Sequence, residues 1–388
     1  MMHVVPRLLA FAFCASAVAC SGGAPAPASG DSIGGSARSA GADGGVTLSA
    51  PAGRAGDSLR VLVYHDMEGL SGQDDYRTFN YSHPEFYAKG QEYLAGDINA
   101  VVDGLFAGGA TKVEIVDAHG SGNPSPDLVP AKLDTRATQL TRDSSFRQYV
   151  DIVAPNTYDA IVAVGMHAKT GSRGFASHTY TLGIDLWMNG RSITETELVA
   201  YSWGRAGVPV IFVSGDDRLA EDLKTMPWIQ YVITKKATSA NTVELRNVDS
   251  VRAEMKAKAA EAVRRLANAK VMRVNEPVKA EIRVVPPARL SMLRGVPGIQ
   301  LSPEGNAVSF EAKDFGAAYD GLVSLIGVAT LAYPAVQNEV IRDHPDSGSI
   351  RRLQRERLMM RWFDVESGRW NPPPPPALTP GRKYYGAQ

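Results

Sequence analysis

The stretch VLVYHDMEG, from Val61 to Gly69, joins a short strand-forming run directly to a histidine and two acidic residues. The apolar part predicts a β-strand, and the polar part follows it without a spacer. In open α/β sheets, binding and catalytic groups collect beyond the carboxyl ends of the strands. Asp66 and Glu68 are therefore candidates for a functional site at that edge. The alternative is a turn whose two acidic side chains cap the backbone or face water.

The sequence around this stretch predicts an α/β fold. Between Leu59 and Ala267, short β-branched runs alternate with longer amphipathic stretches, the pattern of a mainly parallel, doubly wound sheet. The expected strands are Leu59–Tyr64, Lys112–Val116, Tyr158–Val164, Val208–Val213 and Ile229–Lys235. The expected helices are Phe86–Leu105, Glu195–Arg205, Arg218–Thr225 and Val248–Ala267. Residues Tyr180–Ile193 predict a hairpin that turns at Asn189-Gly190, a favoured two-residue turn.

A smaller α+β lobe is expected after this core, because two more strands and an apolar helix follow it. These elements are Val278–Val285, Ala307–Ala312 and a helix from Phe315 to about Tyr333. After Pro334 the sequence predicts an irregular extension, with an amphipathic helix over Arg351–Phe363 and a stiff polyproline segment at Pro372–Pro376. The expected domains are a leader at 1–20, a tether at 21–58, one domain at 59–333 (core about 59–270, smaller lobe about 271–333) and the extension at 334–388.

The N-terminal segment predicts export. MMHVVPRLLAFAFCASAVAC has an early cation, an apolar run and small residues before Cys20, as in a secretory signal peptide. Its last four residues resemble a bacterial lipobox, in which Cys20 is lipidated and becomes the mature N-terminus. Ordinary cleavage after Ala19 is the alternative. The following tether is rich in Gly, Ala, Ser and Pro and is expected to be flexible. We therefore expect a protein anchored by lipid to a bacterial membrane, facing the periplasm or the cell exterior.

Charge and cysteine content exclude several classes of site. The 388 residues include 41 Lys and Arg and 41 Asp and Glu, without a basic stripe, so no nucleic-acid partner is expected. The two cysteines, Cys14 and Cys20, both lie in the leader. The folded part is therefore expected to have no disulfide, no cysteine nucleophile and no thiolate metal site.

Side chains of the metal-ligand type follow the first three predicted strands and begin the second predicted helix. In chain order they are His65, Asp66, Glu68, Asp117, His119, His167, Glu195 and Glu197. A single histidine at a strand end is usually a packed or hydrogen-bonded residue. Histidines at three neighbouring strand ends instead favour a shared metal site, and imidazoles with carboxylates suit Zn²⁺ or a similar divalent ion.

The spacing of Asp66 and Glu68 supports this interpretation. In an extended segment, residues i and i+2 point the same way, so both carboxylates would face one centre while Met67 packs behind them. Asp66 would then bridge two ions through its two oxygens. Gly69 would let the backbone turn tightly beside the cluster.

Two further loops are predicted at the same edge. GSRGFASHTY, residues Gly171–Tyr180, carries His178, which is expected to lie over the metals as a base, nucleophile or donor. The alternative for His178 is a plain loop residue. In the segment GDDR, Asp216 or Asp217 is expected first as a helix N-cap and only then as a substrate contact.

The ordered segments HDMEG, DAHG, GMHA, SHTYTLGIDLWMNGR, TETELVAY and VSGDDR resemble the DppA-like zinc D-aminopeptidases, encoded beside bacterial dipeptide-transport genes. The resemblance covers roughly Leu59 to Tyr333. It implies a homo-oligomer with about two zinc ions per chain. It also implies which residues form the site. The zinc ligands would be Asp66, Glu68, His119, His167 and Glu195, and the catalytic histidine would be His178. Glu197 is only a neighbour of the ligands. His65 departs from the family pattern, which has a small or apolar residue there.

The function implied by this resemblance is metal-dependent hydrolysis of short peptides at the free amino terminus, favouring D-residues as in D-Ala-D-Ala. Two metal ions would activate the attacking water. The preference for D-residues comes from the resemblance alone. One alternative is a two-metal phosphoesterase or another amidohydrolase, for which Lys169 and Arg173 are candidate phosphate contacts. Another is a non-catalytic lipoprotein that binds cell-wall peptides.

Overall fold

The computed structural model describes residues 45–51, 58–121, 123, 125–286, 288–329, 332–371 and 381–387. The predicted signal peptide with Cys20, most of the tether and the polyproline segment Pro372–Pro376 lie outside the described residues.

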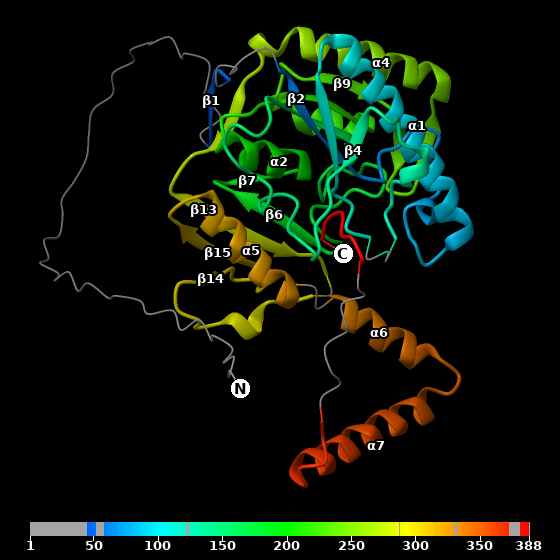
Figure 1. Ribbon diagram of the computed structural model, residues 1–388. Helices are drawn as coiled ribbons and strands as arrows, with labels where there is room; N and C mark the ends of the chain where they lie inside the picture. Colours follow the sequence, from blue (N-terminus) through cyan, green and yellow to red (C-terminus); the bar gives the residue numbers. More distant parts are fainter. Residues whose placement is uncertain are drawn as a thin grey trace, which may run out of the picture. The chain divides into compact units, whose positions relative to one another are not determined.

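A parallel sheet of six strands forms the centre of the fold, in the order β4-β3-β2-β5-β8-β9 (Figure 1). The strands are β2 (Arg60–His65), β3 (Lys112–Asp117), β4 (Ala137–Gln139), β5 (Ala160–Met166), β8 (Val210–Gly215) and β9 (Gln230–Ile233). From β2 the chain proceeds outward to β3 and β4, and then returns to β5 on the other side of β2. The winding direction therefore changes beside β2, where ligands bind in sheets of this kind.

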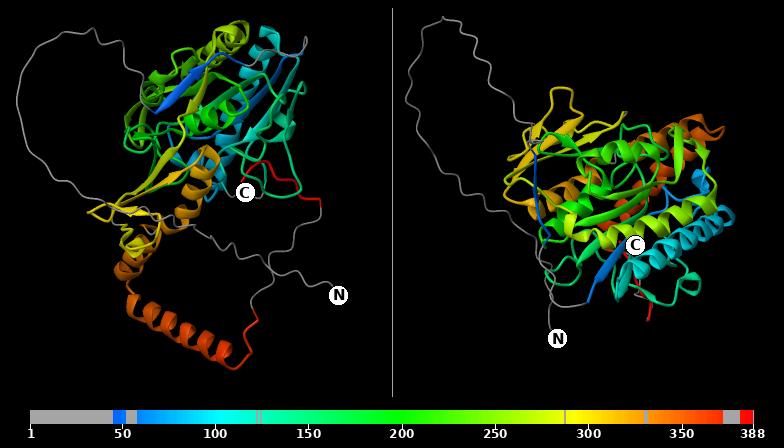
Figure 2. Two further views of the ribbon diagram at one scale, coloured as in Figure 1. Left: turned by 90° about the vertical axis from the view of Figure 1, so that its left-hand side faces the viewer. Right: turned by 90° about the horizontal axis from the view of Figure 1, so that it is seen from above.

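Helices cover both faces of this sheet, which confirms the doubly wound architecture. α1 (Pro84–Gly108) and α4 (Val248–Arg264) pack together on one face, and α2 (Glu195–Gly204) lies on the other (Figures 1 and 2). Val61 and Val63 belong to the apolar core beneath α1 and α4, whereas Leu62 and Tyr64 belong to the core on the opposite face. The alternation of a strand thus explains why the run that opens the fold is apolar throughout.

An antiparallel sheet of five strands, in the order β14-β15-β13-β6-β7, accompanies the parallel sheet. Its strands are β6 (Ile184–Met188), β7 (Arg191–Ser192), β13 (Val278–Val284), β14 (Gln300–Leu301) and β15 (Ala307–Ala312), and α5 (Phe315–Ala329) packs on it. The predicted hairpin turn is confirmed, since Asn189 (φ 50°) and Gly190 (φ 81°) both take the left-handed conformation that a type I′ turn requires. The predicted strand ending at Lys235 is shorter than expected, because that residue begins a separate hairpin of β10 (Lys235–Ser239) and β11 (Thr242–Leu245).

Two segments differ from their predicted structure. Within the expected tether, β1 (Val46–Ser49) pairs antiparallel with β12 (Val271–Val274), because its sequence VTLS places three strand-forming residues side by side, whereas the rest of the tether is mostly Gly, Ala, Ser and Pro. After Pro334 the chain is helical where an irregular course was expected. α6 (Ala332–Asp343) contains Pro334 in its first turn, where the missing N–H breaks no helical hydrogen bond.

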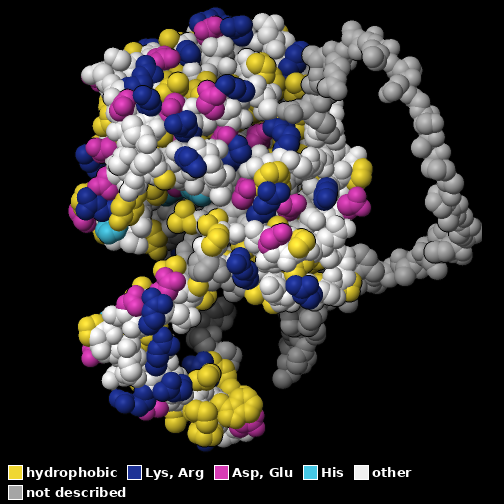
Figure 3. All heavy atoms as spheres, turned by 180° about the vertical axis from the view of Figure 1, so that it is seen from behind, with side chains coloured by type: hydrophobic (Ala, Val, Ile, Leu, Met, Phe, Trp, Pro, Cys, Tyr) yellow, Lys and Arg dark blue, Asp and Glu magenta, His cyan; other side chains and the backbone are white. Residues whose placement is uncertain are grey.

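The predicted helix over Arg351–Phe363 is confirmed within α7 (Ser347–Glu366), but it is not amphipathic in the expected way. Leu358, Met359 and Met360 are consecutive and all exposed, so the apolar side chains do not form one stripe. Apolar and basic side chains are both visible on the surface of this helical region (Figure 3).

Candidate metal centre

The strand ends and one helix start bring the predicted ligands together. β2 pairs in register with β3 and β5, with His65 opposite Asp117 and Val164, so the segments that follow leave the sheet at one level. The side chains gathered there are Asp66 and Glu68 after β2, His119 after β3, His167 after β5, His178 from the following loop and Glu195 at the first residue of α2.

Two groups of potential ligands share Asp66. In one group, Asp66, Glu68 and His119 each offer an atom within 4.8 Å of the others, and in the second group Asp66 is joined by His167 and Glu195. The Nε2 atom of His119 lies 3.5 Å from Oε1 of Glu68. The Nε2 atom of His167 lies 3.4 Å from Oδ2 of Asp66 and 3.4 Å from Oε1 of Glu195. Asp66 is thus the residue that these two groups have in common.

The backbone that carries Asp66 and Glu68 is bent, whereas the spacing predicted an extended segment. The N–H of Met67 donates to Asp66 Oδ1 at 2.8 Å and to Glu68 Oε2 at 3.3 Å, which draws both carboxylates to one side. The bend lies directly against β5, and a Cβ added to Gly69 would sit 1.8 Å from the carbonyl oxygen of Met166. Glycine is therefore required at this position by close packing.

Hydrogen bonds to main-chain carbonyls orient two of the histidines. Nδ1 of His167 lies 3.0 Å from the carbonyl oxygen of Ala168, and Nδ1 of His178 lies 2.8 Å from that of Ala176. A carbonyl oxygen only accepts, so Nδ1 is the protonated nitrogen and the Nε2 lone pair is free in the neutral ring. The two rings stack with their centroids 4.0 Å apart. Both Nε2 atoms are thus available to a cation or to a proton.

A buried carboxylate orients the third histidine. Nδ1 of His119 lies 2.8 Å from Oδ2 of Asp127. Asp127 also accepts hydrogen bonds from the hydroxyls of Tyr87 and Ser121, so it is fixed in place. A carboxylate behind a histidine in this way fixes the ring and raises its basicity, and such pairs are common behind zinc ligands.

Glu195 is held by two donors. The hydroxyl of Tyr149 donates to its Oε2 atom, and the N–H of Tyr180 donates to its Oε1 atom, both at 2.7 Å. Its neighbour Glu197 is engaged differently, since it completes a capping box with Thr194 and pairs with Arg191 at 2.8 Å. The structure therefore places Glu195 in the cluster, whereas Glu197 caps the start of α2.

The unpartnered atoms of the cluster fit a metal ion. Oδ2 of Asp66 and Nε2 of His167 are buried and form no hydrogen bond among the described residues. Buried polar atoms without a partner are costly, and native structures rarely leave them so. Both atoms are of the type that binds zinc, and they belong to a set of only carboxylate oxygens and imidazole nitrogens. A divalent ion would satisfy both of them.

The electrostatics of the cluster point the same way. Burial, together with the charge of Glu68, raises the pKa of Asp66 well above its usual value. Burial opposes the protonation of the histidines, but nearby carboxylates outweigh it and raise the pKa of both His119 and His167 well above the usual range. The buried carboxylates thus favour positive charge in the cluster, and bound metal cations would supply it.

Two predicted site residues lie beside the cluster without joining it. His65 is buried at the end of β2, with its Nδ1 atom 4.0 Å from Oδ1 of Asp117, and it belongs to neither ligand group. Burial lowers the pKa of His65 to about 4, so this ring is neutral near pH 7. Asp117 accepts a hydrogen bond of 2.8 Å from the N–H of His119 and so shapes the loop of that ligand.

The remaining candidates have structural roles. Asp216 is the N-cap of α3 (Asp217–Asp222) and accepts a hydrogen bond from the N–H of Leu219, which confirms the first of its two predicted roles. Lys169 forms an ion pair with Asp222, and Arg173 is exposed to solvent. These contacts do not favour a phosphate clamp.

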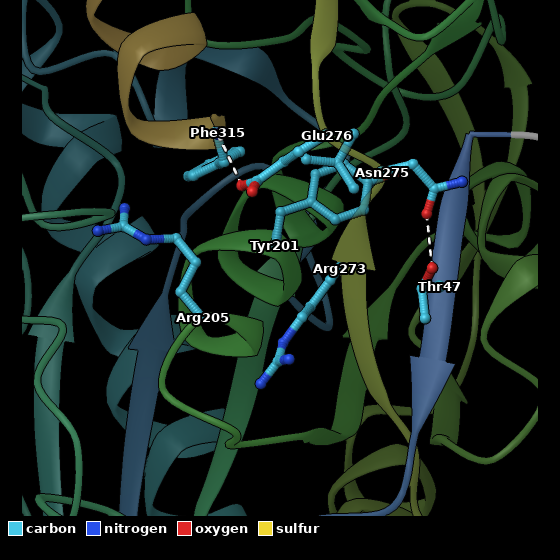
Figure 4. Close-up of a pocket in the computed structure, with 8 residues that line it drawn as sticks. Thr47, Tyr201, Arg205, Arg273, Asn275, Glu276 and Phe315 are labelled. Carbon is cyan, nitrogen blue, oxygen red and sulfur yellow. Dashed lines mark hydrogen bonds between the residues drawn. The ribbon is translucent and has the colours of Figure 1, made fainter. Parts of the chain in front are cut away.

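Asp127 and Tyr149 were not predicted from the sequence, although each holds a ligand in place. Both lie in irregular segments, with no strand end or helix start next to them to suggest a role. A cavity of about 400 Å³ that includes Tyr201, Arg205 and Arg273 lies at the opposite end of α2 from Glu195 (Figure 4). None of the six clustered side chains lines that cavity, so it is a separate feature.

Asp127→Asn is expected to lower zinc affinity by about 10- to 100-fold, because the neutral amide can still orient the ring of His119 but no longer places a negative charge behind it. The measurement is competition with a chromophoric chelator at fixed pH. Asp134→Asn, which changes a carboxylate in a neighbouring surface loop, is the control and should leave the affinity unchanged. Equal affinities for Asp127→Asn and the unmodified protein would show that the charge of Asp127 does not contribute to zinc binding.

Comparison with known proteins gives consistent matches. A family model described as D-aminopeptidase matches residues 59–323. A D-aminopeptidase from Bacillus subtilis (strain 168) is 26% identical over 273 residues, which cover 70% of this chain and 98% of that protein. Among solved structures, the chain is similar to the Zn-dependent D-aminopeptidase DppA from Bacillus subtilis, which is described as a self-compartmentalizing protease. The TM-score is 0.64 and the sequence identity is 24%, and the match covers 70% of this chain and 98% of that one. This structural match shows a shared fold.

Proposed function

The chain belongs to the D-aminopeptidase family of peptide hydrolases, and from this premise we propose that it is a zinc-dependent enzyme that removes N-terminal D-residues from short peptides such as D-Ala-D-Ala. The observation that carries the proposal is the pair of buried ligand groups that share Asp66. The D-aminopeptidase and the zinc-dependent DppA to which the chain is similar support the choice of substrate and metal.

The donor set suggests how two zinc ions would be held. Asp66, Glu68 and His119 would bind one ion, and Asp66, His167 and Glu195 the other. When bound, a pair of zinc ions supplies Lewis-acid activation of the amide carbonyl and of the attacking water. Tyr149 and the N–H of Tyr180 hold the Glu195 carboxylate in place throughout, so the protein does not need to rearrange around it.

His178 is proposed as the proton shuttle. Hydrolysis forms a bond between the water oxygen and the amide carbon and breaks the carbon–nitrogen bond, so the leaving amine must gain a proton that the water loses. The free Nε2 atom of His178, 3.8 Å from Oε1 of Glu195, can accept the proton and then donate it. Burial and the neighbouring His167 lower the pKa of His178, which keeps the ring neutral and able to accept.

Assembly and location are parts of the same proposal. A homo-oligomer is supported by the similar DppA protein, which is described as self-compartmentalizing. Export and a lipid anchor at Cys20 are supported by the sequence of the leader. In that compartment, peptides released from the cell wall would supply D-residues to the enzyme.

The decisive experiment is a substrate comparison with the purified, zinc-loaded protein. D-Ala-D-Ala, L-Ala-L-Ala and p-nitrophenyl phosphate are offered separately, and D-Ala, L-Ala and phosphate are measured. We expect release of D-Ala, its loss with a chelator and its return when zinc is restored. Release of phosphate alone would replace the proposal with a phosphoesterase. Tight binding of D-Ala-D-Ala without products would replace it with a binding protein.

A further inference from the structure

A C-terminal segment returns to the parallel sheet beside the metal centre. Residues 381–387 (red in Figure 1) lie far outside the part of the chain that matches the family model, yet they form a backbone hydrogen bond with Asp117 at the carboxyl end of β3. Tyr384 is buried and forms a pair of 2.9 Å backbone hydrogen bonds with Arg142. The N–H of Phe146 donates to the carbonyl of Gly386 at 3.3 Å, and Lys383 pairs with Asp143.

This segment takes the edge position that β4 leaves free. β4 ends at Gln139, and the N–H of the next residue, Leu140, donates to the carbonyl of Ile115 in β3 at 2.7 Å. Beyond that point, the N–H of Asp117 donates to the carbonyl of Tyr385 at 3.2 Å. On the opposite side, the N–H of Ala118 donates to the carbonyl of His65 at 2.9 Å. The segment that leads to His119 is therefore held between β2 and the C-terminal residues.

The contact is close enough to require glycine. A Cβ added to Gly386 would lie 2.5 Å from the carbonyl oxygen of Asp117, a distance that real side chains do not adopt. The atom approached is part of the backbone, so a larger residue at 386 must move one chain away from the other. One residue further on, the carbonyl oxygen of Ala387 lies 3.6 Å from the position of a Cβ on Gly120, next to His119.

We propose that residues 381–387 form a strap that positions the His119 loop and thereby tightens the binding of zinc. The inference rests on the proposed function in one respect, namely that His119 is a zinc ligand. Without the strap, the N–H of Asp117 loses its partner and the loop of residues 117–120 gains freedom. A ligand on a mobile loop binds metal less tightly, because binding must then order the loop.

The test compares two glycine substitutions in the full chain. Gly386→Ala places a methyl group against Asp117, whereas Gly348→Ala makes the same change in α7, where no atom lies within 4 Å. We expect Gly386→Ala to lower zinc affinity by about 10- to 100-fold, the range found when a supporting contact of a metal ligand is lost. Chelator competition measures this affinity. Hydrogen exchange should show faster exchange of the Asp117 amide in Gly386→Ala, while Gly348→Ala should leave both measurements unchanged.

A second variant that ends at residue 380 removes the strap and should reproduce both effects, with circular dichroism as the check on folding. Unchanged zinc affinity in both strap variants, alongside tight zinc binding by the unmodified protein, would overturn the strap and leave the proposed function intact. An unmodified protein that binds no zinc would overturn the proposed function first and remove the premise of the strap with it.

Discussion

Asp66→Ala should lower the hydrolysis of D-Ala-D-Ala by ~10³-fold or more and reduce the zinc bound per chain. Asp66 belongs to two of the three ligand groups, so its removal takes one donor from each of the two proposed ion sites at once. Metal ions stabilise a transition state of this kind by several kcal/mol, and about 1.4 kcal/mol corresponds to tenfold in rate. Elemental analysis of the dialysed protein and the rate of D-Ala release are the two measurements.

Asp216→Asn is the matched control for this prediction. Asp216 is also a buried carboxylate that follows a strand at the same edge of the sheet, but its oxygens accept from the N–H groups of Leu219 and Phe175. Its substitution should reduce thermal stability slightly and leave the zinc content unchanged. If Asp66→Ala retained the zinc content and activity of the unmodified protein, the metal centre would not lie where the ligand groups place it.

His178→Ala should lower kcat by about 10²- to 10⁴-fold, the usual contribution of a positioned acid–base group, while the zinc content stays the same. The side chain donates from Nδ1 to Ala176 and presents Nε2 to the cluster, the geometry of a proton shuttle. The rate of D-Ala release and elemental analysis, carried out on the same preparation, separate chemistry from metal binding.

The zinc measurement decides between two roles for His178. Its Nε2 atom also forms a possible ligand group with Glu68 and His167. A loss of zinc from His178→Ala would therefore assign it as a ligand and contradict the shuttle. His344→Ala, at an exposed histidine between α6 and α7, is the control and should change neither the rate nor the zinc content.

Most of the ligands that were predicted from the sequence share one property. Asp66, His119 and His167 each follow a buried parallel strand within three residues, and Glu195 begins a helix. Strands of this kind are readily recognised, and their carboxyl ends necessarily meet at one edge of the sheet. The convergence of the ligands was therefore implied by the order of the elements, even though the bend at Asp66–Gly69 differs from the extended course that was assumed.

The contacts that were missed depend on the path of irregular segments. Asp127 reaches His119 from a loop, and Tyr149 reaches Glu195 from a turn separated from it by 46 positions. The C-terminal strap is further still in sequence from the loop it holds. No periodicity marks such residues, because their position is set by tertiary packing. α6 was missed for a different reason, since a proline usually ends a helix but Pro334 lies in the first turn of one.

The exposed apolar residues of α7 have a practical consequence for experiments in solution. Trp362 is 56% exposed on this helix, whereas Trp203 is fully buried in the core. The indole of Trp362 is therefore largely exposed to water, and a partner that buries it against apolar side chains would shift its emission to shorter wavelengths. Among the five tryptophans of the chain, Trp362 can therefore report the binding of such a partner to α7 through its fluorescence.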